Sequence, residues 1–465
     1  MVKFYDRNQV LAVEEKYPPL LYGAWLVLSV LAVLYADQRI LYQDSAFTMF
    51  KLVNLELPVE HYRWGTIILL IPSWICAAVG LPLSLVFAVF SLSSIAVPYF
   101  TSKLIYKWVP DNYLYILPLF IPCSLGAEWY FMAMAEMVPA LCYGLLFAAL
   151  AFRLETPYSS KFTLSIVFLV LAFVTHPASL LFCALSVALL YTTGNKKHAL
   201  RYAGIVFLAV LLKKYALPSS AYEAEYLGRG GLQAWLDIDN NWTLEWVKGG
   251  FLKRFTLPTL VFCCGIILQS KGRKAISQLP VLGAMIFLFL LVVVIYQQGD
   301  SDLMMEKNFA PLLLFAFMPF FYLNHSGRQI RLTMVMLSLL IVSLGLVARF
   351  QHVAFYSERL KNLDALILRH TNERAFVSDT AFESSTWGST WALPYETILR
   401  SSQAKAIHNA SKTINNFKGT QADSAKLATK GMFYGAEFAY PLTNKQLNTR
   451  YYKLSDSGTY KVDLY

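Results

Sequence analysis

Acidic side chains with basic neighbours stand beside the ends of apolar segments in this chain. A carboxylate in such a place can accept a proton, and an ammonium group can hold an anion. The residues of this kind are Asp44, Glu128, Glu136, Asp300, Asp302, Glu306 and Lys307. Because a charge beside a long apolar segment is costly to retain, we interpret these residues as candidates for a functional site.

The chain that must position these side chains is very apolar. Of its 465 residues, 57% are hydrophobic and only 15% are charged. Soluble domains carry about 25% charged residues, so this composition excludes a soluble globular protein of the same length. Long apolar runs separated by short clusters of Lys and Arg are typical of a polytopic α-helical membrane protein.

We expect about 11 transmembrane helices, because a crossing needs about 20 mostly apolar residues. The expected segments are 20–36, 81–102, 112–126, 131–152, 162–176, 178–191, 201–217, 255–270, 279–296, 308–323 and 332–350. The run 65–102 has no charged residue and is long enough to cross twice. We predict one crossing from about Leu81, preceded by a re-entrant or juxtamembrane element at 65–79 that contains Pro72.

The basic residues predict how the chain is oriented. Loops rich in Lys and Arg should face the cytoplasm. These are the loops around Lys103 and Lys107, Arg153 and Lys161, Lys196 and Arg201, Lys271 and Lys274, and Arg328 and Arg331. The N-terminus is then cytoplasmic, whereas the loop 37–64 and the chain after Arg349 are external. All the candidate acids fall on the external face.

The character of the sequence changes near residue 350. We predict a multispanning transmembrane domain at 1–350 and a small extracytoplasmic α/β domain at 351–465, with short strands at 375–378, 437–440 and 451–454. This second domain is where a protein partner would bind. The six cysteines all lie in apolar runs and are expected to pack as small hydrophobic residues.

Four short motifs together resemble the type C glycosyltransferases, which are multispanning membrane enzymes. The first, Asp44-Ser45-Ala46-Phe47, is similar to the acidic motif that begins the first external loop of that superfamily. The others, in the same order as in the family, are Ala135-Glu136-Met137-Val138-Pro139, Thr175-His176-Pro177-Ala178 and Met305-Glu306-Lys307-Asn308-Phe309-Ala310-Pro311. The resemblance covers the order and spacing of elements over residues 20–350.

The resemblance implies transfer of a sugar from a polyprenyl-phosphate donor to a glycan, lipid or protein acceptor, with inversion at the sugar carbon. It implies that Asp44 is the catalytic base. Lys307 is then expected beside the donor phosphate, and Lys213 and Lys214 are further cationic candidates. The remaining candidates for substrate binding are Glu128, Glu136, His176 and Glu306.

The sequence departs from the family pattern at two places. Gln43 stands where many members have a second acid, and the second loop lacks the Asp-x-Asp of metal-dependent oligosaccharyltransferases. A dependence on Mg or Mn therefore stays an open alternative. Asp44 and Glu136 are the candidate metal ligands, because hard oxygen ligands suit both ions.

Two other functions remain open for a multi-pass protein of the bilayer, expected in a bacterial inner membrane. One is a transporter or flippase for a lipid-linked or anionic substrate, although such proteins usually place charges in mid-segment and show related halves. The other is a non-catalytic membrane subunit that binds a partner through its external tail. The basic and aromatic loop 213–254 could suggest nucleic acid, but an external membrane loop argues against that partner.

Overall fold

The structure is a computed structural model. It describes residues 18–109, 113–125, 129–153, 160–193, 195–215, 235–236, 244–245, 247–248, 258–264, 279–295, 302–322, 328–378, 381–403, 410–417, 429–435 and 441–463. Within this part the chain is mostly helical, with a small sheet near the C-terminus. The α-helices of the bundle are α1 (Pro19–Leu34), α2 (Ala36–Ile40), α3 (Gln43–Val53), α4 (Ile67–Ala78), α5 (Leu83–Trp108), α6 (Leu117–Ser124), α7 (Met137–Arg153), α8 (Ser160–Thr175), α9 (Ser179–Thr192), α10 (Lys196–Tyr215), α15 (Leu279–Ile295), α16 (Asp302–Tyr322) and α17 (Arg328–Arg369).

Two helices of the described part are long and apolar enough to cross a membrane, Leu83–Trp108 and Met336–Arg369. Other apolar helices are 10–17 residues long, which is shorter than the usual crossing. Each segment expected to cross overlaps a helix, but most of 255–270 lies outside the described residues. The helical class is therefore confirmed, whereas a count of about 11 crossings stays a prediction.

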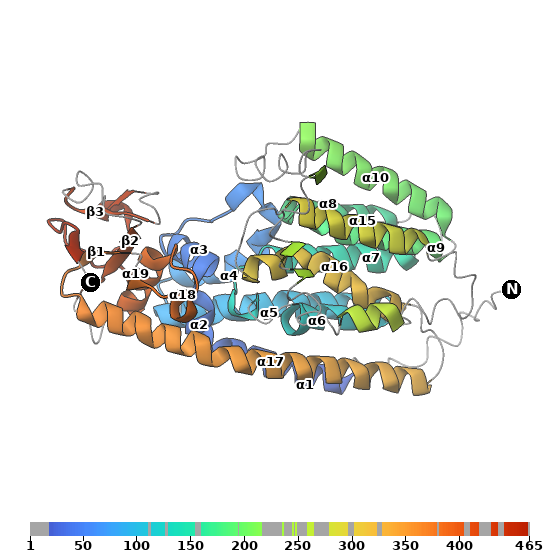
Figure 1. The fold of residues 1–465 in the computed structure, drawn as a ribbon, viewed down its shortest axis with the longest axis horizontal. Coiled ribbons are helices and arrows are strands. Elements are labelled where there is room, and N and C mark those ends of the chain that lie inside the picture. The colour runs from blue at the N-terminus through green and yellow to red at the C-terminus, as the bar shows by residue number, and fades with distance from the viewer. Residues whose placement is uncertain are drawn as a thin grey trace.

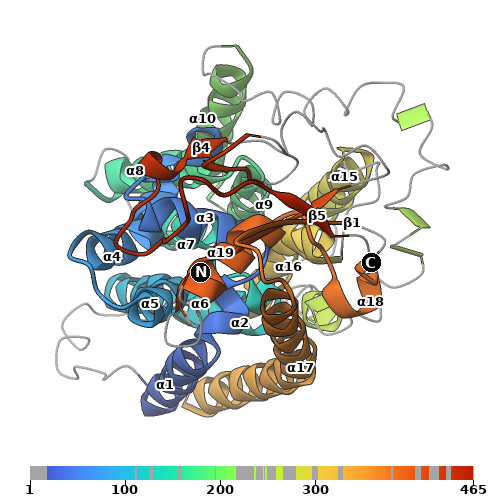
Figure 2. The ribbon, with the colours of Figure 1, turned by 90° about the vertical axis from the view of Figure 1, so that its left-hand side faces the viewer.

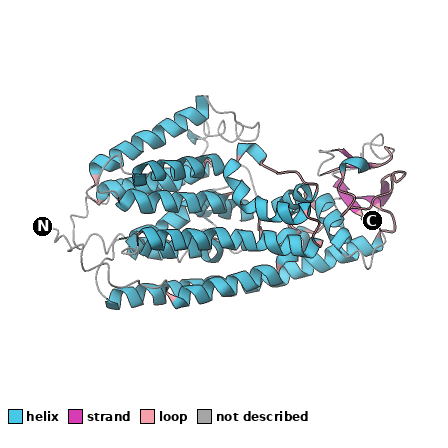
Figure 3. Cartoon of the chain, turned by 180° about the vertical axis from the view of Figure 1, so that it is seen from behind, coloured by secondary structure: helices cyan, strands magenta, loops and turns pink. Residues whose placement is uncertain are grey.

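The long helices run side by side, so that the bundle has two ends (Figure 1). Helix α1 begins at one end, and α2, α3 and the C-terminal sheet lie at the other, which we call the domain end (Figures 1 and 3). Lys103, in the last turns of α5, donates a hydrogen bond to Tyr22 at the start of α1, so α5 finishes at the end where α1 begins. Seen from the domain end, α1 and α17 lie on the opposite side of the bundle from α10 (Figure 2).

The uncharged run 65–102 folds into a short helix and a long one. Helix α4 has 12 residues and contains Pro72. At 1.5 Å per residue it is about 18 Å long, well short of the hydrocarbon thickness of about 30 Å. Gly80, at φ +77°, makes the turn to the 26-residue α5. These lengths agree with one crossing preceded by a shorter element.

Helix α17 differs from the expected last crossing at 332–350. It continues without a break for 42 residues, about 63 Å, and ends at Arg369. The continuation has a physical reason, since residues 346–369 contain neither Gly nor Pro and bury Tyr356, Leu363 and Ile367. The predicted domain boundary at 350 thus falls inside one helix, and the division at that residue stays a prediction.

The C-terminal part beyond α17 is a small α/β unit. Its strands are β1 (Arg374–Ser378), β2 (Thr413–Phe417), β3 (Met432–Phe433), β4 (Leu442–Thr443) and β5 (Lys461–Asp463), and its helices are α18 (Ser384–Trp387) and α19 (Leu393–Gln403). Three strands form a parallel sheet in the order β2-β1-β5, and β3 pairs antiparallel with β4. Helix α19 connects two adjacent parallel strands, as parallel pairing requires a crossover.

One of the three predicted strands is confirmed and one is wrong. The prediction at 375–378 matches β1, whereas 437–440 lies outside the described residues. Residues 451–454 form no strand. Instead the Tyr451 hydroxyl donates a hydrogen bond of 2.8 Å to the carbonyl of Leu81 at the turn between α4 and α5, so this segment docks on the bundle rather than on the sheet.

The core of the C-terminal unit is shared with the first loop of the bundle. Buried side chains of α3, α4 and α5 belong to one hydrophobic cluster with those of α17, α19 and β1. Phe50 of α3 stacks on Phe433 with ring centroids 4.8 Å apart and also contacts Tyr395. The C-terminal unit is therefore packed directly on α3 and shares a hydrophobic core with the bundle.

Candidate functional site

Asp44 lies in the first turn of α3, at the domain end of the bundle. Its side chain is 35% exposed, so it is accessible to a molecule that approaches from outside. The next residue, Ser45, is fully buried, and its hydroxyl accepts a hydrogen bond of 2.9 Å from the backbone N–H of Met134. This contact ties the start of α3 to the segment that leads to Glu136.

Three charged side chains from other parts of the chain meet beside Asp44. The Lys307 ammonium in α16 lies 3.7 Å from a carboxylate oxygen of Asp44 and 3.0 Å from Glu136 Oε2. Arg63 Nη1 donates a hydrogen bond of 2.8 Å to Glu136 Oε1. Glu136, directly before α7, thus accepts from two cations at once. We call Asp44, Arg63, Glu136 and Lys307 the charged cluster.

Close backbone packing places Arg63 in the cluster. Gly65 lies against the Thr175 side chain at the end of α8, where a Cβ atom would collide with it. The Tyr143 hydroxyl in α7 donates a hydrogen bond of 3.2 Å to the Gly65 carbonyl. Because both contacts involve the residue two positions after Arg63, they fix this loop against the ends of α7 and α8.

His176 occupies the turn between α8 and α9 and is buried. Its Nδ1 accepts a hydrogen bond of 3.2 Å from the backbone N–H of Ala178, which leaves the proton of the neutral ring on Nε2. Burial lowers the pKa of His176 well below its usual value, and the positive charges of Arg63 and Lys307 lower it further. His176 is therefore a neutral imidazole at pH 7.

The two carboxyl groups of the cluster differ in pKa. Although Asp44 is one-third exposed, the protein packed around the rest of its carboxylate raises its pKa, and the charge of Glu136 raises that pKa further, whereas Lys307 and Arg63 lower it. Burial would also raise the pKa of Glu136, but Lys307 and Arg63 outweigh burial and hold that pKa well below the usual value. Glu136 therefore favours its charged form more strongly than Asp44 does, and Asp44 is the carboxylate better suited to accept a proton.

The structure brings together four of the predicted site residues and leaves others apart or untested. Asp44, Glu136 and Lys307 are in contact, and His176 lies near enough to Glu136 for a charge on its ring to lower the pKa of that carboxyl group. Lys213 is half-buried near the end of α10, a helix at the outer edge of the bundle (Figure 2). Glu128 and the side chains of Lys214 and Glu306 lie outside the described residues.

Sequence reasoning missed Arg63. A signal was present, since Arg63 is the last charged residue before the uncharged run that begins at Trp64. A cation at the boundary of an apolar run is costly to bury without a partner, so the position of Arg63 predicts an acidic side chain nearby. Which acid that would be depends on tertiary packing, because Glu136 is 73 residues away.

The candidate metal ligands do not offer an open site. The ammonium of Lys307 lies within 4 Å of both Asp44 and Glu136, and Arg63 takes the other oxygen of Glu136. A divalent cation between these carboxylates would meet two positive charges that already satisfy Glu136. As arranged, the two carboxylates fit ammonium and guanidinium groups better than Mg or Mn, so we derive no step through a metal.

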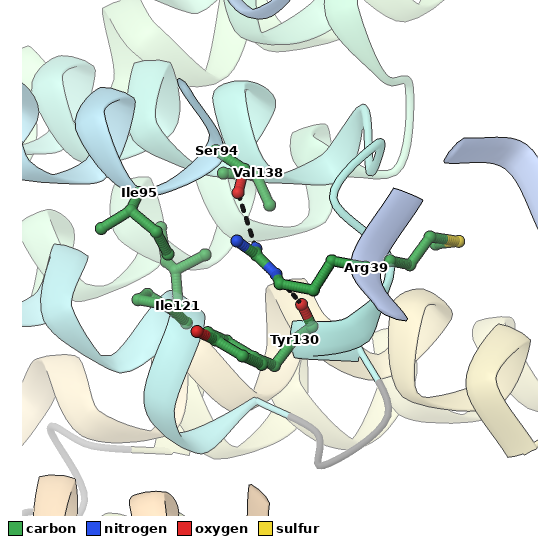
Figure 4. Close-up of a pocket in the computed structure, with 8 residues that line it drawn as sticks. Arg39, Ser94, Ile95, Ile121, Tyr130 and Val138 are labelled. Carbon is green, nitrogen blue, oxygen red and sulfur yellow. Dashed lines mark hydrogen bonds between the residues drawn. The ribbon is translucent and has the colours of Figure 1, made fainter. Parts of the chain in front are cut away.

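A separate small cavity lies beside Arg39 (Figure 4). Its volume of about 20 Å³ is room for about one water molecule, which is too small for a sugar or a phosphate. The buried Arg39 guanidinium donates to the Tyr130 carbonyl at 2.8 Å, to the Ser94 hydroxyl at 2.7 Å and to Ser91. These bonds tie α2 to α5 and to the segment before α7, which is a structural role.

The fold and the cluster define the class of protein only broadly. The described part of the chain is mostly helical, includes two helices long and apolar enough to cross a membrane, and has a group of opposite charges at one end of its bundle. No protein family, no curated protein and no solved structure matches the chain. The functional argument therefore depends on the chemistry of the cluster.

Proposed function

We propose that the protein is a multi-pass membrane glycosyltransferase that moves a sugar from a polyprenyl-phosphate donor to a hydroxyl acceptor. The observation that carries the proposal is the contact of Lys307 with both Asp44 and Glu136. These residues come from three regions far apart in the sequence. Asp44 and Glu136 lie at the starts of α3 and α7, and Lys307 lies in the second turn of α16. Their meeting at one end of the bundle gives one site both a proton acceptor and a cation for phosphate.

Sugar transfer from a polyprenyl phosphate needs chiefly a base for the acceptor hydroxyl and a cation beside the phosphate. Asp44 accepts the proton of the acceptor hydroxyl while that oxygen bonds to the anomeric carbon of the sugar. The bond from this carbon to the phosphate oxygen breaks, and polyprenyl phosphate leaves with the electron pair. A positioned base of this kind contributes typically 10²–10⁴-fold in rate, and a cation near the leaving oxygens stabilises the charge that develops there.

The charges of the cluster favour this sequence of events. With Asp44 ionised, its charge and that of Glu136 balance those of Arg63 and Lys307. Once Asp44 has taken the proton, the two cations face only one anion. The cluster becomes net positive at the moment when the leaving phosphate gains negative charge, so proton transfer and departure of the phosphate assist each other.

Glu136 and His176 have supporting roles in this proposal. Glu136 holds Arg63 and Lys307 through its two oxygens, and it thereby keeps both cations beside Asp44. His176, neutral and with its proton on Nε2, is a hydrogen-bond donor that adds no charge. Such a donor suits a sugar hydroxyl or a phosphate oxygen.

Lys307→Gln is expected to weaken donor binding and to change the pH dependence of transfer. Lys307 lowers the pKa of Asp44, so its removal raises that pKa. A base with a higher pKa is protonated, and inactive, up to a higher pH. The acid-side fall in activity should therefore move to higher pH, and the apparent KM for a radiolabelled polyprenyl-phosphate hexose should increase. An unchanged pH profile together with an unchanged KM would count against the phosphate role.

The proposal places the domain end outside the cytoplasm, with the N-terminus inside. Single cysteines at the exposed positions Lys197 and Ser457, in a variant lacking the six native cysteines, test this orientation. In sealed inside-out vesicles, a membrane-impermeant maleimide should label position 197 and should reach position 457 only after detergent is added. Labelling of position 457 in intact inside-out vesicles would overturn the orientation and with it the external site.

A further inference from the structure

The C-terminal unit touches the chain directly beside Asp44. Glu396 of α19 is fully buried, and its Oε1 accepts a hydrogen bond of 3.3 Å from the backbone N–H of Gln43. Its other oxygen, Oε2, accepts a bond of 2.5 Å from the Arg359 guanidinium in α17. Arg359 also donates to the Leu41 carbonyl at 2.9 Å and lies over the Tyr42 ring, 4.7 Å from its centroid.

The residue held by this pair has an unfavourable backbone. Gln43 has φ +45°, in the left-handed region that residues other than glycine rarely adopt. Among the described residues, all the non-glycine positions with positive φ lie in the first loop, at Gln43, Leu55, His61 and Tyr62. A strained conformation of this kind persists only where surrounding contacts hold it.

The position of Gln43 gives this strain a consequence for the site. Gln43 is the first residue of α3, and Asp44 is the second, so a rotation at Gln43 swings the Asp44 carboxylate relative to Lys307. We infer that Glu396 and Arg359 are positioning residues, which hold Asp44 in register with Lys307 from the C-terminal unit. The inference rests on the proposed function, in which Asp44 is the base.

Arg400 provides a matched control on the same helix. It lies one turn after Glu396, and it bridges the C-terminal unit to α2 through Asp37 Oδ2 at 2.8 Å and to α17 through Asp364. Removal of Arg400 weakens the same interface without touching the bond from Gln43. A comparison of the two sites therefore separates positioning of Asp44 from general attachment of the C-terminal unit.

The experiment uses the full-length protein in bilayer nanodiscs with a radiolabelled polyprenyl-phosphate hexose. The double variant Arg359→Met/Glu396→Met replaces the buried ion pair by apolar side chains that fill similar space, a change that buried pairs often tolerate. We expect kcat to fall by about 10–100-fold, since a displacement of about 1 Å at a reacting group can cost that much, with little change in the KM for the donor. The acid-side fall in activity should also move to a different pH, because burial, Lys307 and Glu136 together set the pKa of Asp44 and a displaced Asp44 meets all three differently.

Gln43→Gly gives a second and independent readout. Glycine adopts a positive φ without steric cost, so the loop needs less external support. Added to the double variant, Gln43→Gly should restore part of the lost kcat. If the double variant does not fold, Glu396→Gln, which preserves the side-chain shape but leaves one oxygen to accept from both Gln43 and Arg359, provides the comparison with Arg400→Gln.

The outcomes distinguish this inference from the proposed function. Arg400→Gln should retain the wild-type kcat and pH profile. A double variant with wild-type kcat and pH profile, or an equal loss of kcat in Arg400→Gln, would overturn the positioning role. If Asp44→Asn transfers sugar at the wild-type rate, the proposed function, in which Asp44 is the base, fails. If Asp44→Asn is inactive while the double variant is normal, only the positioning role is lost.

Discussion

Asp44→Asn is expected to lower the rate of sugar transfer by about 10²–10⁴-fold, the usual contribution of a positioned general base. Asparagine keeps the shape of the side chain and an oxygen that can face Lys307, but its amide cannot accept the proton of the acceptor. The measurement is the initial rate of transfer from a polyprenyl-phosphate hexose in nanodiscs. Because the acceptor is defined only as a hydroxyl compound, the rate is followed as release of polyprenyl phosphate.

Asp37→Asn is the control for this substitution. Asp37 also lies in the first loop, but it pairs with Arg400 and Gln403 of the C-terminal unit and not with Lys307. The rate of sugar transfer by Asp37→Asn should remain near that of the wild type. In the wild type, activity should fall on the acid side at a pH above 3.8, the ordinary pKa of an aspartate, because burial and the charge of Glu136 raise the pKa of Asp44. A wild-type rate in Asp44→Asn would exclude this residue as the base.

Glu136→Gln is expected to have the largest effect on stability. The substitution leaves Arg63 and Lys307 buried beside each other without the anion that accepts from both. Loss of one member of a buried ion pair typically costs about 3–5 kcal/mol, because the remaining charge is left uncompensated. Thermal unfolding in detergent should show this loss. Glu60→Gln, which breaks the more exposed pair with Lys51, should cost about 1 kcal/mol or less.

The same substitution also changes the pH dependence, and in the opposite direction from Lys307→Gln. The negative charge of Glu136 raises the pKa of Asp44, so its removal lowers that pKa and moves the acid-side fall to lower pH. Opposite shifts in the two variants are the signature of one titrating group that lies between an anion and a cation. Shifts in the same direction, or thermal stability equal to that of Glu60→Gln, would contradict the arrangement of the cluster.

The sequence was most informative at positions where a charged side chain beside an apolar segment is energetically costly. A carboxylate beside an apolar helix is retained only for a reason, and this argument selected Asp44, Glu136 and Lys307, which the structure brings into contact. It could not select Glu396, whose bond to Gln43 joins residues 353 positions apart. Nothing local in the sequence marks such a pair, since only the packing of α19 on α3 brings its members together.

For the fold, too, the sequence predicted what depends on neighbouring residues and not what depends on packing between distant segments. Apolar runs about as long as a membrane crossing located the helices, and the strand predicted at 375–378 matches β1. The end of the last apolar segment near residue 350 did not mark the end of α17, because the change there from apolar to amphipathic composition does not interrupt a helix. The segment 451–454 was predicted to be a strand, but Tyr451 and Tyr452 are buried through contacts with the bundle and with Phe50.

A cryo-EM structure of the protein with a bound polyprenyl phosphate tests the central claim most directly. If the charged cluster is the donor site, the phosphate should lie at the domain end, with an oxygen about 2.7–2.9 Å from Lys307 Nζ, and Asp44 should face the space where the acceptor would enter. A phosphate bound away from Lys307 and Arg63, with the contacts of the cluster unchanged, would contradict the proposed function.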